Sequence, residues 1–291
     1  MNPSNALVPH LDPIALRRER RLWSDEAPWL HEEVGLQMAE RLAWFSKAPT
    51  TWLDWEPSWG GLRAYQAVAK QFPRAKRWVY EPEIELAGSR RGWRWPWAKS
   101  GAPWDGKTLV DMLWANMGLR GVLDPQATLK QWLSALRPGG LLMFSAFGPH
   151  TLEIVREIYS EQGWGEAMTP LTDMHDWGDM LIAASFADPV LDSSFLDLTY
   201  SDTDALMADL RTLGSNTHGQ RFAGCRTRTW LQELHAALRT RLPRDESGRL
   251  VLRIELVWGH ASAPQGVVAQ TGETSISVAR MRDMLRESHS K

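Results

Sequence analysis

Apolar residues along the chain repeat with two different periods, and the two patterns alternate through most of the sequence. Helix-type spacing, three or four positions apart, is clear over residues 28–46, where Leu30, Val34 and Met38 share one face. The nearly continuous apolar run at 141–147 is typical of a strand buried on both faces. This alternation predicts an α/β fold, a mostly parallel sheet with helices on both faces.

The same patterns predict the remaining elements. Further strands are expected at residues 50–54, 77–80, 108–114, 189–200 and 249–260. Further helices are expected at residues 12–22, 60–71, 124–136, 151–160, 175–185, 202–213 and 227–241. The segment Arg137-Pro138-Gly139-Gly140 is expected to end the helix before it. The last two strands are expected to close the sheet as an antiparallel pair.

The 291 residues are enough for one large domain or two small ones, and no stretch rich in Pro, Gly or Ser divides them. We expect an N-terminal helical lid or substrate region over 1–46 and the α/β domain over 47–265. That domain carries a Trp-rich, irregular insertion at about 88–107. Residues 266–291 are expected to form a polar tail.

Composition and charge exclude several kinds of protein. Lys and Arg total 33 against 35 Asp and Glu, and the net charge of −2 argues against a nucleic-acid partner. No apolar run reaches the roughly 18 residues of a membrane span, and the N-terminus lacks the apolar core of a secretory signal. Cys225 is the one cysteine, which excludes an internal disulfide and a cysteine-rich metal site. We therefore expect a cytoplasmic protein with neither a membrane nor a nucleic-acid partner.

Several segments resemble a known family. These are Val110–Leu119, Leu136–Pro149, Asp173–Asp179, Phe186–Asp192, Leu210–Asn216 and Trp258–Ala261. The first two resemble the fourth-strand signature and the Leu-Arg-Pro-Gly-Gly turn of class I S-adenosylmethionine (SAM) methyltransferases. The others are similar to the biotin-pathway malonyl-[acyl-carrier protein] O-methyltransferases. The resemblance implies a Rossmann-like sheet of seven strands, the last inserted antiparallel.

The resemblance also implies SAM as the cofactor and a set of residues that bind it. Asp54 and Gly60 match the family's glycine-rich loop after the first strand, and Glu81 stands where an acidic residue accepts hydrogen bonds from the ribose hydroxyls. Asn116 follows the strand with the fourth-strand signature. For Glu81 an alternative is that it only caps the segment that begins at Pro82.

The loop departs from the family pattern. Glu56 and Ser58 replace the first two glycines, so that a side chain and a negative charge lie where the ligand's methionine moiety is expected. Pro57 and Trp59 add bulk. A loop of unchanged shape should cost about 1–3 kcal/mol at Glu56.

Two further matches are missing. The Trp-rich insertion replaces the acidic residue expected near the adenine. The pair Ser24-Asp25 stands where the family has Tyr-Asp ahead of its second helix.

The reaction in this family needs little from the protein beyond alignment. A carboxylate is already ionised at neutral pH, so methylating it requires no general base, and we assign no catalytic residue. No metal is expected, because His175 among its acidic neighbours is typical of a helix cap after Asp173. The implied substrate is an acyl-carrier protein thioester or another small carboxylate. The basic helix with Arg17 and Arg20 either docks that acidic partner or is a solvated face.

Two functions remain open from the sequence. The first is an active SAM-dependent O-methyltransferase related to malonyl-[acyl-carrier protein] methylation in biotin synthesis. The second is a catalytically inactive methyltransferase fold that acts as a binding or regulatory protein. The conformation of the loop at 55–61 is expected to distinguish them, because ligands of open α/β sheets bind above the strand ends.

Overall fold

The fold is built on one seven-stranded sheet. The computed structural model describes residues 10–22, 27–81 and 101–265. The strand order is β3-β2-β1-β4-β5-β7-β6, with β7 antiparallel to both of its neighbours and the first five strands parallel. The strands are β1 (Thr51–Trp55), β2 (Lys76–Tyr80), β3 (Ala102–Pro103), β4 (Val110–Ala115), β5 (Leu136–Phe147), β6 (Ala187–Tyr200) and β7 (Leu250–Ser262). This topology confirms the predicted class I methyltransferase fold.

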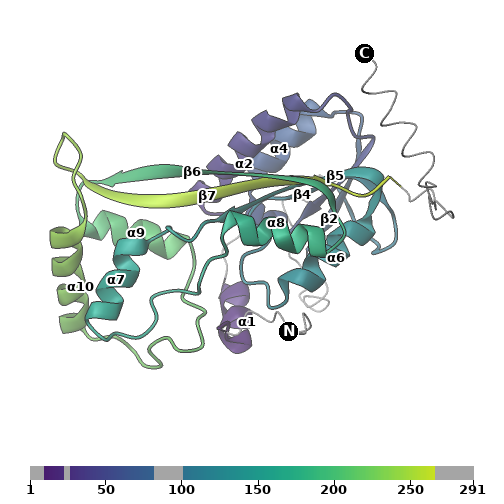
Figure 1. The fold of residues 1–291 in the computed structure, drawn as a ribbon. Helices are drawn as coiled ribbons and strands as arrows, with labels where there is room; N and C mark the ends of the chain where they lie inside the picture. Colours follow the sequence, from purple (N-terminus) through teal and green to yellow (C-terminus); the bar gives the residue numbers. More distant parts are fainter. Residues whose placement is uncertain (1–9, 23–26, 82–100, 266–291) are drawn as a thin grey trace, which may run out of the picture.

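Helices cover both faces of the sheet (Figure 1). On one face α2 packs on α4, and on the other α6 packs beside α8. The helices are α1 (Pro13–Leu22), α2 (Trp29–Arg41), α3 (Pro57–Gly60), α4 (Leu62–Gln71), α6 (Pro125–Ala135), α7 (Glu153–Glu161), α8 (Met174–Ala183), α9 (Thr203–Thr212) and α10 (Arg228–Arg241), with a 3₁₀ turn, η1 (Leu42–Trp44).

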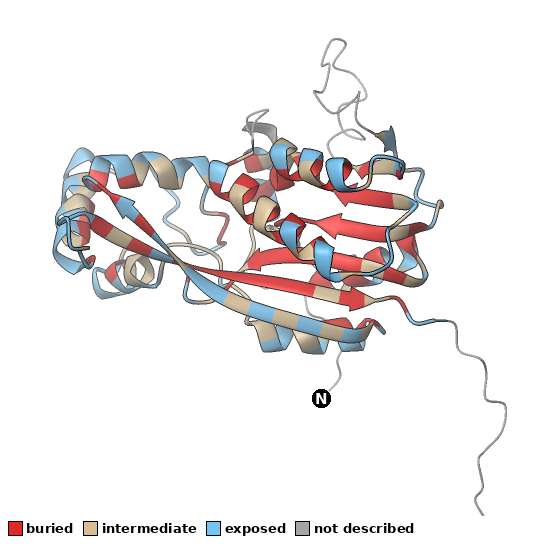
Figure 2. Ribbon diagram, turned by 90° about the horizontal axis from the view of Figure 1, so that it is seen from above, coloured by how far each residue is buried: buried red, intermediate tan, exposed pale blue. Residues whose placement is uncertain are grey.

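Two hydrophobic clusters lie on opposite faces of the sheet. Trp52 and Tyr65 belong to the cluster beneath α2 and α4, whereas Trp132, Phe144 and Trp177 belong to the cluster beneath α6 and α8. The central strands are therefore buried on both sides, as Figure 2 shows. This burial explains why the 141–147 segment carries an unbroken apolar run rather than an alternating one.

The two longest strands extend beyond the rest of the sheet. β6 and β7 pair along most of their length, from Ala187 opposite Ser262 to Tyr200 opposite Leu250. Helices α7, α9 and α10 pack below the far end of this ribbon (Figure 1), and their apolar side chains continue the first cluster. β6 is the edge strand and alternates between exposed and partly buried residues (Figure 2).

Predicted and observed elements differ in several places. The helix expected to end at Leu136 ends at Ala135, and Pro138 to Gly140 lie inside β5, where the register with β4 is irregular and Gly139 has φ 73°. The helix expected over 28–46 ends at Arg41 and continues as η1. Residues 102 and 103, expected to be irregular, pair with β2 as β3.

Other predictions concern segments outside the described residues. These are the insertion up to residue 100, the Ser24-Asp25 pair and the polar tail over 266–291. None of the helices within the described residues is long and apolar enough to cross a membrane.

Candidate functional site

The loop that follows β1 is folded into a short helical turn. Glu56 takes a left-handed conformation, φ 54° and ψ 57°, which glycine adopts more readily, and α3 begins directly after it. The Glu56 amide donates to the Tyr80 carbonyl at 2.8 Å, and the Glu56 carbonyl accepts from the Trp59 and Gly60 amides at 3.0 and 3.1 Å. The loop thus keeps a backbone conformation that is typical of glycine, although the residue is a glutamate. This conformation should lower the free energy of unfolding by about 1–3 kcal/mol.

Glu81 lies at the end of β2 and binds this loop. Its Oε2 accepts a hydrogen bond from the Ser58 amide at 3.2 Å, and only 5% of the residue is exposed. Burial and the nearby Glu56 carboxylate raise the pKa of Glu81 to about 7, although Ser58 and Arg20 oppose the shift. Glu81 therefore holds α3 in place, whereas the segment beginning at residue 82, which it was expected to cap in the alternative considered from the sequence, lies outside the described residues.

Asp54 is the most isolated acid of the site. Its side chain is buried, and Oδ1 has no hydrogen-bond partner within the described residues. Burial, with the negative charges of Glu81 and Glu32 nearby, raises the pKa of Asp54 well above its ordinary value. Because a desolvated carboxylate without a partner is costly, Asp54 favours its protonated form here.

Asn116 joins four segments below the loop. Its Nδ2 donates to the carbonyls of His31 at 2.7 Å and Gly60 at 2.5 Å, and its Oδ1 accepts from the Ser145 hydroxyl at 2.6 Å. A Cβ on Gly60 would lie 3.2 Å from the Asn116 carbonyl oxygen, so the small residue is needed for this close approach. The four predicted residues, Asp54, Gly60, Glu81 and Asn116, therefore lie together at the carboxyl ends of β1, β2 and β4, and their binding to a cofactor stays a prediction.

Helix α1 lies over this end of the sheet and is attached by ion pairs. Arg20 contacts the Glu56 carboxylate at 3.2 Å, with side-chain exposures of 16% and 6%. Glu19 contacts Arg120 at 3.0 Å and also accepts from the Ser215 amide. Arg20 is thus turned inward, contrary to the solvated face considered from the sequence, whereas the neighbouring Arg17 and Arg18 are exposed.

Two consecutive residues of α2 also enter the site. Glu32 Oε2 accepts from the Ala64 amide at 3.1 Å, and a Cβ on Gly61 would lie 2.4 Å from the same oxygen. His31 is fully buried and its Nδ1 contacts the Trp59 carbonyl at 2.9 Å. Burial, together with the Arg120 charge, lowers the pKa of His31 to about 3, so the imidazole is neutral at pH 7.

Sequence reasoning missed Glu32, His31 and the inward role of Arg20. One available signal was that position 31 lies three residues before Val34 and seven before Met38, on the face that the apolar residues define as buried. A histidine followed by a glutamate beside that face is an indication of a polar contact inside the fold. The pairing of Arg20 with Glu56 left no such signal, because 36 residues separate them.

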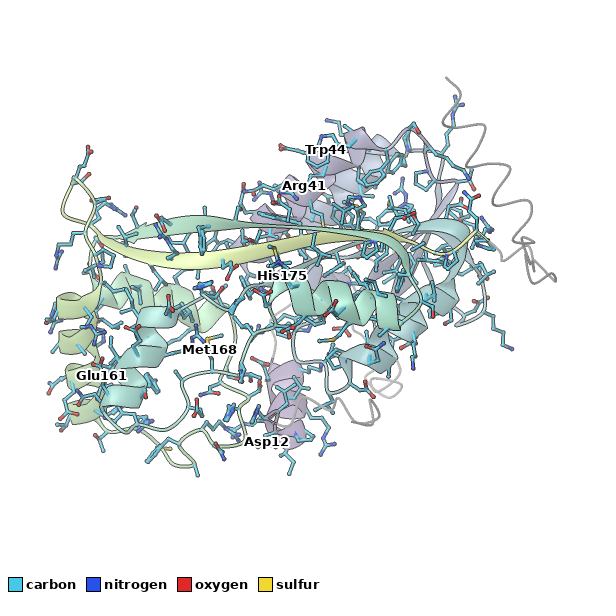
Figure 3. The ribbon with its side chains drawn as sticks, in the orientation of Figure 1. Asp12, Arg41, Trp44, Glu161, Met168 and His175 are labelled. Carbon is cyan, nitrogen blue, oxygen red and sulfur yellow. The ribbon has the colours of Figure 1, made fainter. Side chains whose placement is uncertain are left out.

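A cavity of about 400 Å³ opens beside the site, at the ends of β4 and β5. Met117, Phe147 and Tyr159 contribute to a mostly apolar lining, and Arg120 and Arg211 add positive charge. Met168, labelled in Figure 3, lies on the connection between α7 and α8 and also lines the cavity. Its size and lining suit a small organic ligand. The acidic residues of the β1 loop do not line it.

The candidate metal residues form a helix cap instead. Asp173 Oδ1 accepts from the His175 amide at 2.8 Å and also contacts His175 Nδ1 at 2.8 Å, at the start of α8. This confirms the predicted cap. The described part of the chain contains no group of three or more His, Cys, Asp or Glu side chains arranged to hold a metal ion.

The sheet order, the inserted antiparallel β7 and the loop at the end of β1 define the chain as a class I methyltransferase-type α/β protein. Comparison with curated proteins is more specific. The malonyl-[acyl-carrier protein] O-methyltransferase of Gallionella capsiferriformans is 31% identical over 278 residues, covering 88% of this chain and 91% of that protein. The chain therefore belongs to the malonyl-[acyl-carrier protein] O-methyltransferase family.

Other relatives carry the same name. That of Legionella pneumophila is 27% identical over 261 residues, covering 87% of this chain and 90% of that protein. That of Laribacter hongkongensis is 38% identical over 156 residues, covering 53% of this chain and 52% of that protein. No protein-family model matches the chain. SAM is the cofactor that membership of this family implies.

The residues of the loop, as they are arranged here, do not fit that cofactor. The amides of Glu56, Ser58, Trp59, Gly60 and Gly61 all donate within the chain, and Pro57 has none to offer. The close approach that Gly60 permits is taken by Asn116, and Glu81 accepts from the chain itself. The conformation therefore presents no amide cradle to a ligand, which agrees with the departure from the family pattern seen in the sequence.

Proposed function

We propose that this chain binds the carboxylate end of an acyl thioester carried by acyl-carrier protein, and that its reaction is O-methylation of that carboxylate. The acceptor is the one that the relatives' names give. The observation that supports the proposal is the cavity at the ends of β4 and β5, which is apolar enough for an acyl chain and carries Arg120 and Arg211 on its lining.

The chemistry of the acceptor suits such a cavity. A carboxylate is ionised at neutral pH, so the protein has to position and desolvate it rather than remove a proton. Arg211 offers it a charge-assisted hydrogen bond. Outside the cavity, the exposed Arg17 and Arg18 on α1 provide positive charge for an acidic carrier protein.

A second candidate function is binding of the same acyl thioester without methyl transfer. One observation favours it, the engagement of the β1 loop with the chain's own side chains. This candidate is the catalytically inactive methyltransferase fold that the sequence left open.

One experiment separates the two candidates. Malonyl-[acyl-carrier protein] is titrated into the protein by calorimetry and then incubated with it and SAM, with the methyl ester detected by mass spectrometry. Saturable binding with ester formation supports the first candidate, and saturable binding without ester supports the second. Absence of binding contradicts both.

A matched pair of variants tests whether the acyl thioester binds in the cavity. Arg211→Ala removes a charge from the lining and should weaken binding by a factor on the order of 10. Arg228→Ala, at the first position of α10 and exposed, serves as the control and should leave binding unchanged. Equal affinity of the two variants would contradict the placement of the acceptor in this cavity.

A further inference from the structure

The N-terminus of α4 already holds a carboxylate. In doubly wound sheets the first helix after β1 points its free amides at a bound anion. Gly61, the residue before α4, has no side chain to cap those amides. Glu32 supplies the missing cap from α2, with its Oε2 3.1 Å from the Ala64 amide and 9% of the residue exposed.

A second carboxylate fills the loop in front of that helix. Glu56 is 5% exposed, and its carboxylate is neutralised by Arg20 of α1 at 3.2 Å. Its position is the one where the family has glycine and where the ligand's methionine moiety is expected. The ion pair between Glu19 and Arg120 holds α1 against the sheet. Arg20 of α1 is therefore held in place, and it fixes the Glu56 side chain.

The surroundings oppose the entry of another anion. Glu81 and Asp54, whose Oδ1 has no hydrogen-bond partner within the described residues, lie beside the two glutamates, so four acidic residues share this end of the sheet. A ligand carboxylate placed here would have to share a water-poor environment with the Glu32 and Glu56 carboxylates, whose partners are already engaged, which is unfavourable.

We infer that Glu32 and Glu56 occupy the position of a ligand's carboxylate, so that SAM binds this chain through its adenosine and sulfonium and without recognition of its amino-acid end. The inference concerns the cofactor side of the site and does not rest on the proposed acceptor. It predicts that the wild-type loop does not select ligands that carry the amino-acid moiety. Removing the two carboxylates should create this selectivity.

The test compares two ligands on the full chain by calorimetry. S-adenosylhomocysteine carries the amino-acid moiety, whereas 5′-methylthioadenosine has the same adenosine and thioether without it. The proteins are the wild type, Glu56→Gly, the double variant Glu32→Gln with Glu56→Gly, and Glu40→Gln as the control. Glu40 is an exposed residue of the same α2 helix. Far-UV circular dichroism and thermal melting establish that each variant is folded.

The expected result is that the wild type and Glu40→Gln show no preference for S-adenosylhomocysteine, at concentrations up to about 1 mM. The double variant should prefer it over 5′-methylthioadenosine by a factor on the order of 10 or more. If the double variant does not fold, Glu56→Gly alone should show the preference.

Either of two results would overturn the inference. One is a wild type that binds S-adenosylhomocysteine at least about tenfold more tightly than 5′-methylthioadenosine. The other is a folded double variant that gains no preference. Neither result depends on whether acyl-carrier protein binds, so the failure of this inference is distinguishable from the failure of the proposed function.

Discussion

Single residues at the end of β1 act mainly as connections within the chain. Asn116 has both amide hydrogens and its oxygen engaged, and it joins α2, α3 and β5 through His31, Gly60 and Ser145. Such a saturated buried network fixes a single arrangement of the segments that it joins. The predicted cofactor residue is therefore first a structural one.

Replacing Asn116 should be costly. Asn116→Ala leaves two carbonyls and a hydroxyl without their partner in a buried place, which should lower the free energy of unfolding by about 2–4 kcal/mol. Urea unfolding measures this loss. Asn216→Ala is the matched control, because that side chain is only partly buried although it donates to the Glu166 carbonyl and accepts from the His218 amide, and its cost should be about 1 kcal/mol. A similar cost for both variants would contradict the network.

Glu81 should make stability depend on pH. Its pKa is raised to about 7, so the folded state holds a proton that the unfolded state releases. The stability that this proton contributes is fully present below the unfolded pKa near 4.3 and is lost as the pH rises through about 7, in total about 3 kcal/mol. His31 acts in the opposite direction, because its lowered pKa makes stability rise with pH up to about 6.5.

The difference between wild type and Glu81→Gln isolates the contribution of Glu81. The unfolding free energy of the wild type, relative to the variant, should fall by about 3 kcal/mol between pH 4.5 and 7.5. Urea denaturation at several pH values measures it. A pH-independent difference would show that Glu81 ionises in the folded protein as it does in the unfolded chain.

At the scale of elements, α1 is the part that closes the site. It reaches the β1 loop through Arg20 and the α9–α10 connection through Glu19 and Asp12, which contacts Arg221 at 2.9 Å. Its sequence is basic and would form only a marginal helix alone, since ten residues are too few for a stable isolated helix. The docked state therefore depends on these ion pairs and on the buried Leu16.

Removing the Glu19 charge should loosen α1 selectively. Glu19→Gln removes the negative charge that the largely buried Arg120 contacts, which should cost about 2 kcal/mol after allowance for partial exposure. Amide hydrogen exchange in α1 should then accelerate by about thirtyfold. Exchange in β5 should not change, and Arg18→Ala, at an exposed position of the same helix, should leave α1 as protected as in the wild type. Acceleration throughout the sheet would indicate general destabilisation instead.

At the scale of the whole molecule, the long β6–β7 ribbon joins two regions that would otherwise be separate. The sheet with α2, α4, α6 and α8 lies at one end, and α7, α9 and α10 lie at the other (Figure 1). Both strands run through both regions, and the first hydrophobic cluster continues along them. The predicted single α/β domain over 47–265 should therefore unfold as one cooperative unit.

Two core variants test that cooperativity. Leu234→Ala in α10 and Leu129→Ala in α6 each remove a fully buried side chain, at opposite ends, and should each cost about 2–5 kcal/mol. Both should lower the midpoint of the same urea transition, followed by far-UV circular dichroism and by tryptophan fluorescence, without changing its slope. A transition that splits for Leu234→Ala alone would show that the helices at the far end of the ribbon unfold independently.

The sequence predicted the elements far better than the contacts between them. Periodicity located α10 and the C-terminal end of β5 to within a residue, because burial on one or two faces produces a characteristic local spacing of apolar residues. The start of β5 lies five residues before the predicted one. The cap of α4 by Glu32 and the pairing of Arg20 with Glu56 were not predictable in this way, since each joins elements distant in the chain. Gly139 and Gly140 were expected to end the preceding helix, but that helix ends at Ala135 and both glycines lie inside β5, where the register with β4 is irregular.

The insertion of β7 between β5 and β6 has a consequence for biosynthesis. β5 is complete once Phe147 has been made, yet its outer edge pairs only with residues at the end of the described chain, Leu256 to Ser262. During translation that edge remains a strand without a neighbour, and β6 emerges before the strand that will separate the two. Nascent chains that stop short of β7 should consequently be prone to aggregate. The solubility of the N-terminal half on the ribosome therefore depends on how soon β7 is synthesised and pairs with β5.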